Sequence, residues 1–170
     1  HELGSAYLRD NRLQRLAAPL LVPLAGAHRG VAQLAVLPRW ETEYLLKEQA
    51  PQSLVLVTNV RTRLPSYLTP PGPAILSGLS RADVRAALGS EEFFTRTGRG
   101  PASLADLGEL LRRVRAQGCA VESEEISAGV VTVAAPIADA SGHPIAALGL
   151  SVEVERTEAL EELSEAVRQA

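Results

Sequence analysis

Three β-patterned segments lie in the last third of the chain: Cys119–Glu124, Val130–Ala138 and Pro144–Val152. The first alternates with the period of two of a strand, so one face can be buried while the other carries carboxylates. The loop Asp139–His143 joins the other two and is rich in residues that turn a backbone sharply. The pattern predicts a hairpin and three adjacent antiparallel strands.

The first half of the chain carries three further strand-like runs. Gly30–Leu37 and Glu41–Lys47 are separated by Pro38–Trp40, which is short enough for a hairpin. A third run, Gln52–Thr58, is apolar on both faces, as expected for a strand in a central position. The whole pattern predicts about six strands in an antiparallel sheet.

Apolar residues spaced by three to four positions predict helices elsewhere. Such a stripe occurs in residues 5–27, where Pro19 interrupts it. Because proline removes an amide donor and clashes inside a helix, we expect one helix to end near Leu16 and a second to begin near Ala18. The stripe consists of Leu13, Leu16, Leu20 and Leu24.

Helix starts are marked by Ser-x-x-Asp spacings, in which the serine hydroxyl can accept an amide proton of the first turn. They follow Ser80 and Ser103, with a left-handed stop expected at Gly89 and a second helix end at Gly118. An acidic amphipathic helix is expected over 155–169. With the strands, these elements predict an α+β fold, an antiparallel sheet of about six strands with flanking helices.

A proline-rich loop lies between the strands of the first half and these helices. Residues 65–73 include Pro65, Pro70, Pro71 and Pro73. Because proline cannot donate to a ladder or a helix interior, we expect no regular structure before about Ala74 and a short helix over residues 74–76. The prediction is a rigid loop that leads into a helix.

Composition fits one domain, because 170 residues with 46% hydrophobic content can bury a core. A net charge of −3 gives this piece no electrostatic reason to hold DNA, and no apolar run has the length of a membrane span. The sequence contains no methionine, so we interpret it as a fragment. With one cysteine and no visible signal peptide, a cytoplasmic origin is expected.

Asp139, Ser141 and His143 bring a carboxylate, a hydroxyl and an imidazole together, so a nucleophilic triad is a candidate. In one short turn they cannot line up as nucleophile, base and orienting acid, and Asp and Ser are ordinary turn formers. We expect no metal and no cofactor, because ligand spacing, a P-loop and a dinucleotide fingerprint are all missing. The potential metal ligands are scattered over His1, His28, His143 and Cys119.

Glu122, Glu124 and Glu125 form an acidic cluster that either is a solvated strand face and turn or contributes a carboxylate to a pocket. For Glu125 we favour the solvated turn. Both interpretations stay open for Glu122, because strand alternation sets it on the side of Ala120, away from Val121. A carboxylate beside a pocket there would orient the polar group of a ligand.

Four motifs follow one another between residues 63 and 151. They are RLPSYLTPPGPAILSGL at 63–79, G-x-A-x-E-x-E-E at 118–125, G-V-x-x-V-A-A-P-I-x-D-x-x-G at 129–142 and A-A-L-x-L-S at 146–151. Their residues and spacing resemble the C-terminal effector-binding domain of IclR-family transcriptional regulators.

This resemblance implies a GAF-like or profilin-like fold that binds a small-molecule effector without catalysis and forms a homodimer or homotetramer. Residues 1–27 would form a linker and N-terminal helices, and residues 28–170 the effector-binding domain. DNA would be bound only by a winged helix-turn-helix domain upstream. Carried over by position, the ligand contacts fall on Thr69, Pro70, Pro71, Glu122, Thr132, Gly149 and Ser151.

Three positions depart from the family's pattern. Members that bind small organic acids often have Ser in place of Gly149, Cys in place of Thr132 and Lys in place of Pro73. One hydroxyl fewer and a proline-lined wall imply a partly apolar or aromatic organic acid rather than a glyoxylate-like ligand. Two alternatives stay open: a small hydrolase that uses His143 or Glu122, and a vestigial pocket that serves oligomerisation only.

Overall fold

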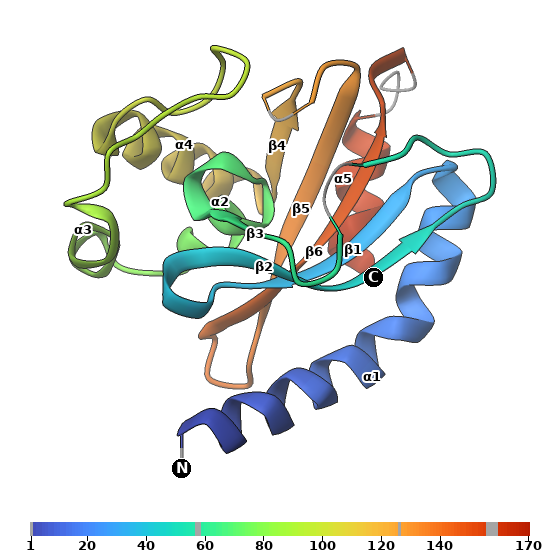
Figure 1. The fold of residues 1–170 in the computed structure, drawn as a ribbon, viewed down its shortest axis with the longest axis horizontal. Helices are drawn as coiled ribbons and strands as arrows, with labels where there is room; N and C mark the ends of the chain where they lie inside the picture. The colour runs from blue at the N-terminus through green and yellow to red at the C-terminus, as the bar shows by residue number, and fades with distance from the viewer. Residues whose placement is uncertain (1, 57–58, 126, 156–159) are drawn as a thin grey trace.

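A six-stranded antiparallel sheet forms the centre of the described chain, with helices on both of its faces (Figure 1). The computed structural model describes residues 2–56, 59–125, 127–155 and 160–170. The strand order is β3-β2-β1-β6-β5-β4. The strands are β1 (Val31–Val36), β2 (Glu41–Gln49), β3 (Arg63–Pro65), β4 (Ala120–Ser123), β5 (Val130–Ala138) and β6 (Pro144–Glu153). The predicted α+β fold is confirmed.

The β5–β6 hairpin is closed by the loop that the sequence marked as a turn. Oδ1 of Asp139 accepts hydrogen bonds from the amides of Ser141 and His143, at 2.9 and 3.0 Å. A short side chain that bonds backbone amides two and four residues ahead stabilises such a reversal. β4 pairs with the other edge of β5, so the three adjacent antiparallel strands are confirmed.

The β1–β2 hairpin is also confirmed, with a 3₁₀ turn over Pro38–Trp40. Arg39 and Trp40 have positive φ angles of 53° and 66°, which reverse the chain within three residues. Trp40, the one tryptophan of the sequence, is 40% exposed on this turn. The hairpin therefore carries an aromatic side chain at its tip.

The strand expected over Gln52–Thr58 is wrong for the part of the segment that is described. Residues 52–56 form no strand, and Val55 is 83% exposed; residues 57–58 lie outside the described ranges. Gln52 has a positive φ of 60°, which turns the chain away from the sheet just after β2. The central positions belong to β1 and β6, and β3 pairs at the edge instead.

α1 runs without a break over Glu2–His28, so the expected division near Pro19 is wrong. Pro19 and Pro23 lie on the exposed side of the helix, where water can satisfy the carbonyls that lose an amide partner. Of the expected stripe, Leu16 and Leu20 are 63% and 41% exposed. The stripe that contacts the sheet is Leu13, Ala17, Leu21, Leu24 and Ala25.

The proline-rich loop becomes helical earlier than expected. A 3₁₀ turn, η2 (Ser66–Leu68), precedes α2 (Pro71–Leu76). α2 begins at Pro71 rather than near Ala74, because the fixed φ of proline suits the first helical turn. Gly72 is required by close packing, since a Cβ there would lie 1.8 Å from the carbonyl oxygen of Ser66.

α3 (Arg81–Leu88) and α4 (Leu104–Gln117) begin where the capping spacings predict. The hydroxyls of Ser80 and Ser103 each accept an amide hydrogen bond at 3.1 Å. Gly118 ends α4 with a φ of 74°, whereas Gly89 has a φ of −66°, so the expected left-handed stop after α3 is wrong. α5 covers Leu160–Gln169, and residues 156–159 of the expected helix lie outside the described ranges.

Side chains alternate between two differently covered faces of the sheet. α1 and α5 lie on one face, over residues such as Leu34 and Leu150 (Figure 1). α2 and α4 pack on the opposite face, over Ala134 and Ala147; this side is called the α2 face below. A smaller apolar cluster joins η2, α2, α3 and α4.

Leu21→Ala tests the helix stripe that contacts the sheet, because Leu21 is fully buried. We expect the free energy of unfolding to fall by about 2–5 kcal/mol, through lost transfer free energy and an unfilled cavity. The matched control Leu16→Ala, at a largely exposed position, should change it by less than about 0.5 kcal/mol. Urea unfolding followed by circular dichroism measures both, and equal losses would contradict this orientation of α1.

Candidate functional site

A row of polar side chains crosses three strands on the α2 face. Glu122 on β4 lies opposite Thr132 on β5, and Thr132 lies opposite Ser151 on β6. The three are 4%, 6% and 1% exposed, respectively. Strand alternation puts them on the side of Ala134 and Ala147, so the fold brings together three of the residues singled out in the sequence.

Thr132 and Ser151 are hydrogen-bonded to each other, with 2.8 Å between Oγ1 and Oγ. Two hydroxyls hold two protons, and their mutual bond uses one, so the pair can still donate one. Gly149 lies two residues before Ser151 on the same face. A Cβ on Gly149 would lie 3.7 Å from Cγ of Pro71, which places the start of α2 directly over this part of β6.

The acidic cluster after β4 is held by backbone amides. One carboxylate oxygen of Glu122 accepts a hydrogen bond from the amide of Glu125. Glu124 accepts one from the amide of Gly129 at 2.9 Å and pairs with Arg99 at 3.1 Å. Glu125 is partly buried rather than fully solvated as expected, and this burial raises its pKa.

The proline-rich loop is tied to the sheet through Thr69. Its Oγ1 lies 2.7 Å from Oγ1 of Thr42 on β2, and both residues are buried. The phenol of Tyr44, two residues further along β2, is also hydrogen-bonded to Thr69. Burial raises the pKa of Tyr44, the bond with Thr69 opposes part of this shift, and the negative charge of Glu122 adds to it. Thr69 and Glu122 therefore both influence the pKa of the Tyr44 phenol.

The prolines that follow Thr69 complete the apolar side of the site. Pro70 and Pro71 are buried at the start of α2, and Pro73 is buried within it. Proline rings offer no hydrogen-bond donor, so this side faces the polar row of the sheet with an apolar surface.

Sequence reasoning missed three residues of the α2 face: Gln33, Thr42 and Tyr44. Gln33 is 2% exposed and lies opposite Gly149 on β6. A signal was present, because an amide at an alternating position inside the apolar run of β1 marks a face that is buried but polar.

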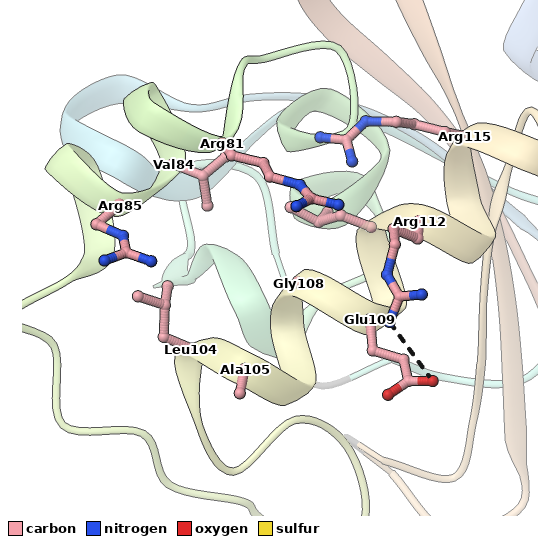
Figure 2. Close-up of a pocket in the computed structure, with 10 residues that line it drawn as sticks. Arg81, Val84, Arg85, Leu104, Ala105, Gly108, Glu109, Arg112 and Arg115 are labelled. Carbon is pink, nitrogen blue, oxygen red and sulfur yellow. Dashed lines mark ion pairs between the residues drawn. The ribbon is translucent and has the colours of Figure 1, made fainter.

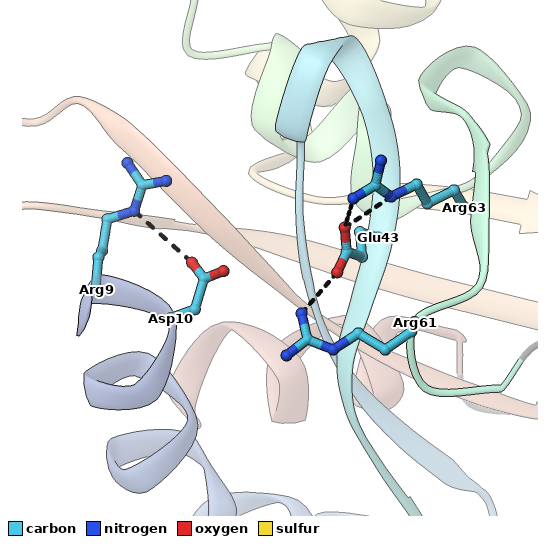
Figure 3. Close-up of polar contacts among 5 residues, drawn as sticks. All are labelled: Arg9, Asp10, Glu43, Arg61 and Arg63. Carbon is cyan, nitrogen blue, oxygen red and sulfur yellow. Dashed lines mark hydrogen bonds and ion pairs between the residues drawn. The ribbon is translucent and has the colours of Figure 1, made fainter. Parts of the chain in front are cut away.

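The segment that precedes the proline-rich loop is held to β2 by a cluster of ion pairs around Glu43 (Figure 3). Glu43 is 5% exposed, and its two oxygens lie 2.7 Å from Nη1 of Arg61 and 2.8 Å from Nη2 of Arg63. On α1, Asp10 pairs with Arg9 at 3.9 Å. Burial raises the pKa of Asp10, and the positive charges of Arg9 and Arg61 oppose the shift. Ion pairs with Glu43 therefore hold the segment before the proline-rich loop to β2, and the charge of Arg61 also acts on Asp10 of α1.

The Asp139–His143 loop is organised as a turn. The hydroxyl of Ser141 donates to Oδ1 of Asp139 at 2.6 Å, and this bond, with the amide of His143, holds the pKa of Asp139 below its usual range.

In the described parts of the chain, no three His, Cys, Asp or Glu side chains gather as a metal site. Within the same ranges, no helix combines the length and apolarity of a bilayer-spanning segment.

A double-mutant cycle on Thr132 and Ser151 tests the buried hydroxyl pair. Thr132→Val or Ser151→Ala leaves the other hydroxyl without its partner, so each should lower the free energy of unfolding by about 1–3 kcal/mol. The double variant should lose less than the sum of the two, with a coupling of at least about 0.5 kcal/mol. Urea unfolding measures all four proteins, and strictly additive losses would refute the shared bond.

The sequence also matches known proteins over almost its full length. Residues 5–170 match the family model described as the C-terminal domain of the bacterial transcriptional regulator IclR. The Pca regulon regulatory protein of Pseudomonas putida is 33% identical over 155 residues, and the HTH-type transcriptional regulator XynR of Escherichia coli K12 is 31% identical over 157. These alignments cover 91% and 92% of this chain but 53% and 62% of the relatives, so the chain spans little more than half their length.

Solved structures share the fold. The crystal structure of the Thermotoga maritima IclR has a TM-score of 0.89 at 26% identity, over 99% of this chain and 69% of that one. An IclR homologue from Microbacterium hydrocarbonoxydans, complexed with 4-hydroxybenzoate, has a TM-score of 0.85 at 23% identity, over 94% and 65%. The motif resemblance and the GAF-like fold are thereby confirmed. The chain belongs to the IclR family of bacterial transcriptional regulators and forms the C-terminal domain of that family.

Proposed function

We propose that this domain senses a small organic acid, which binds between the α2 face of the sheet and the proline-rich loop. The observation that carries the proposal is the buried polar row, above all the hydroxyl pair of Thr132 and Ser151. A face that only packed against helices would be more stable with apolar residues, because buried hydroxyls must find partners. Such a row suits the recognition of a polar ligand.

Each part of the proposed site has a distinct task. The hydroxyls of Thr132 and Ser151 would donate to a ligand carboxylate when their mutual bond is exchanged for two bonds to the ligand. Glu122 would accept from a ligand hydroxyl. The prolines would contact the apolar part of the ligand. The proposed contacts are Thr69, Pro70, Pro71, Glu122, Thr132, Gly149 and Ser151.

A ligand in this position would act on bonds that join loop and sheet. Thr69 holds the loop to β2, and Pro71 lies against β6 at Gly149. α1 packs on the opposite face of the same strands, so a shift of the sheet would alter the population of α1 orientations. We assign residues 1–27 to the linker and N-terminal helices and residues 28–170 to the effector-binding domain. A winged helix-turn-helix domain would precede them, within the length of the relatives that this chain does not span.

The proposed regulator acts in the cytoplasm, on its operator DNA, as a homodimer or homotetramer. Paired copies are expected because operator half-sites call for paired readers. We also propose that the domain is not catalytic. The hydroxyl of Ser141 is committed to Asp139, which leaves His143 without a nucleophile in its own turn.

Isothermal titration with 4-hydroxybenzoate, benzoate, glyoxylate and pyruvate tests the ligand class. We expect the aromatic acids to bind at least about tenfold more tightly than the two keto acids, a difference of about 1.4 kcal/mol. The reasons are the proline surface and the missing hydroxyl at Gly149. 4-Hydroxybenzoate is included because the Microbacterium homologue was solved with it.

Ser151→Ala should weaken binding of the preferred acid, whereas Ser141→Ala, in the exposed turn, is the matched control and should leave the affinity unchanged. Tight binding of glyoxylate or pyruvate, with none of the aromatic acids, would refute the ligand class. If no acid binds or raises the melting temperature, the sensor proposal fails and an assembly role is favoured.

A further inference from the structure

A basic groove lies between α3 and α4, apart from the α2 face (Figure 2). It has a volume of about 380 Å³. Arg81 and Arg85 line it from α3, and Arg112 and Arg115 from α4, against the single carboxylate of Glu109. Three positive charges are therefore unbalanced within one groove of a chain whose net charge is −3.

The four guanidinium groups differ in what already binds them. Arg115 is fixed, because it donates to the carbonyl oxygens that follow α2, at 2.7 and 3.1 Å. Arg112 lies 3.8 Å from Glu109, a long and exposed ion pair of little strength. The guanidinium groups of Arg81 and Arg85 have no hydrogen bond or ion pair with any residue in the described ranges. Most of the donor capacity of the groove is therefore available.

The side chains in Figure 2 define where an anion would sit. Arg81 extends from α3 toward α4, and Arg112 and Arg115 project from α4 around the same end of the groove. Arg85 lies near the other end, beside Leu104. A ligand with more than one anionic group could contact both ends.

Gly108 leaves space on the α4 side of this groove. A Cβ at this position would meet no atom within 4 Å, and its φ is not positive, so neither packing nor backbone conformation demands glycine. Glycine inside a helix costs about 1 kcal/mol relative to alanine. The open space lets a ligand approach the backbone of α4 between the arginines.

We propose that this groove binds a small polyanion with phosphate groups. The guanidinium fork of arginine bonds phosphate oxygens in pairs, and the groove volume lies in the range of small-molecule sites. A nucleic acid would need a longer basic stripe, whereas here the charge is confined to one groove of an acidic chain. The groove is lined by other residues than the organic-acid site on the α2 face.

The groove also has a physical link to α2. Arg115 bonds the carbonyls of Ser77 and Leu79, just after the C-terminal end of that helix. An anion that draws the Arg115 side chain toward itself would compete with these two bonds. The polyanion would thereby act on the helix whose first residue, Pro71, lies over β6.

Inorganic pyrophosphate is the probe, titrated into the 170-residue chain by calorimetry at low and moderate salt. We expect saturable one-to-one binding, weakened at least about tenfold in Arg81→Ala/Arg112→Ala, since several charge-assisted bonds are lost. The matched control Arg96→Ala/Arg113→Ala removes the same charge from exposed positions outside the groove and should keep the affinity within about twofold.

Gly108→Leu tests the groove without changing any charge. Leucine favours the helix and fills the open space, so the variant should fold and still lose pyrophosphate binding. Absence of saturable binding to the parent chain, or equal weakening in the control pair, would overturn the proposal. It would also be overturned if pyrophosphate fails to bind while sedimentation shows that Gly108→Leu disrupts self-association, because the groove would then be a contact between copies.

Discussion

Buried polar groups must be hydrogen-bonded, and this constraint organises the α2 side of the domain. Thr132 bonds Ser151 across the neighbouring strands β5 and β6, and Thr42 bonds Thr69 between β2 and the proline-rich loop. Both bonds are shielded from water, so breaking either without replacing it is unfavourable. Under the proposed function, a ligand that offers replacement bonds would be admitted, whereas an apolar molecule of the same size would be rejected. Specificity would then follow from the same physical rule that holds the loop in place.

The two faces of the sheet differ in composition and in the helices that cover them. The face under α1 and α5 is mainly apolar, and its buried carboxylate, Glu43 on β2, is paired with Arg61 and Arg63. The opposite face carries the polar row and is covered by α4 and by α2, into which the proline-rich loop leads. Because both faces share the same strands, a ligand-induced rearrangement on one side would, under the proposed function, also displace residues on the other. This arrangement suits a sensor that reports to a helix.

Local patterns predicted much of this fold, and non-local contacts account for the errors. The two hairpins and the serine caps depend on neighbouring residues, which a sequence displays directly. Whether residues 52–56 or β3 form the edge strand depends on which segment pairs with β2, and the local pattern of apolar residues does not determine that pairing. Pro19 was misjudged because its cost depends on whether the freed carbonyl meets water, and this in turn depends on the orientation of α1. The predicted site residues of β4, β5 and β6 do lie together on the α2 face. Tyr44 and Gln33 join them through the pairing of β1 with β2 and β6, and a single strand's pattern does not show that pairing.

The position of Trp40 gives the chain an optical reporter of its own. This residue sits at the tip of the β1–β2 hairpin, two positions before Thr42, whose hydroxyl holds the loop through Thr69. As the sequence has no other indole, its tryptophan fluorescence arises from Trp40 alone, and solvent reaches this partly exposed side chain. Quenching by iodide would thus report the exposure of the hairpin tip, beside the contact between β2 and the loop, with no dye attached.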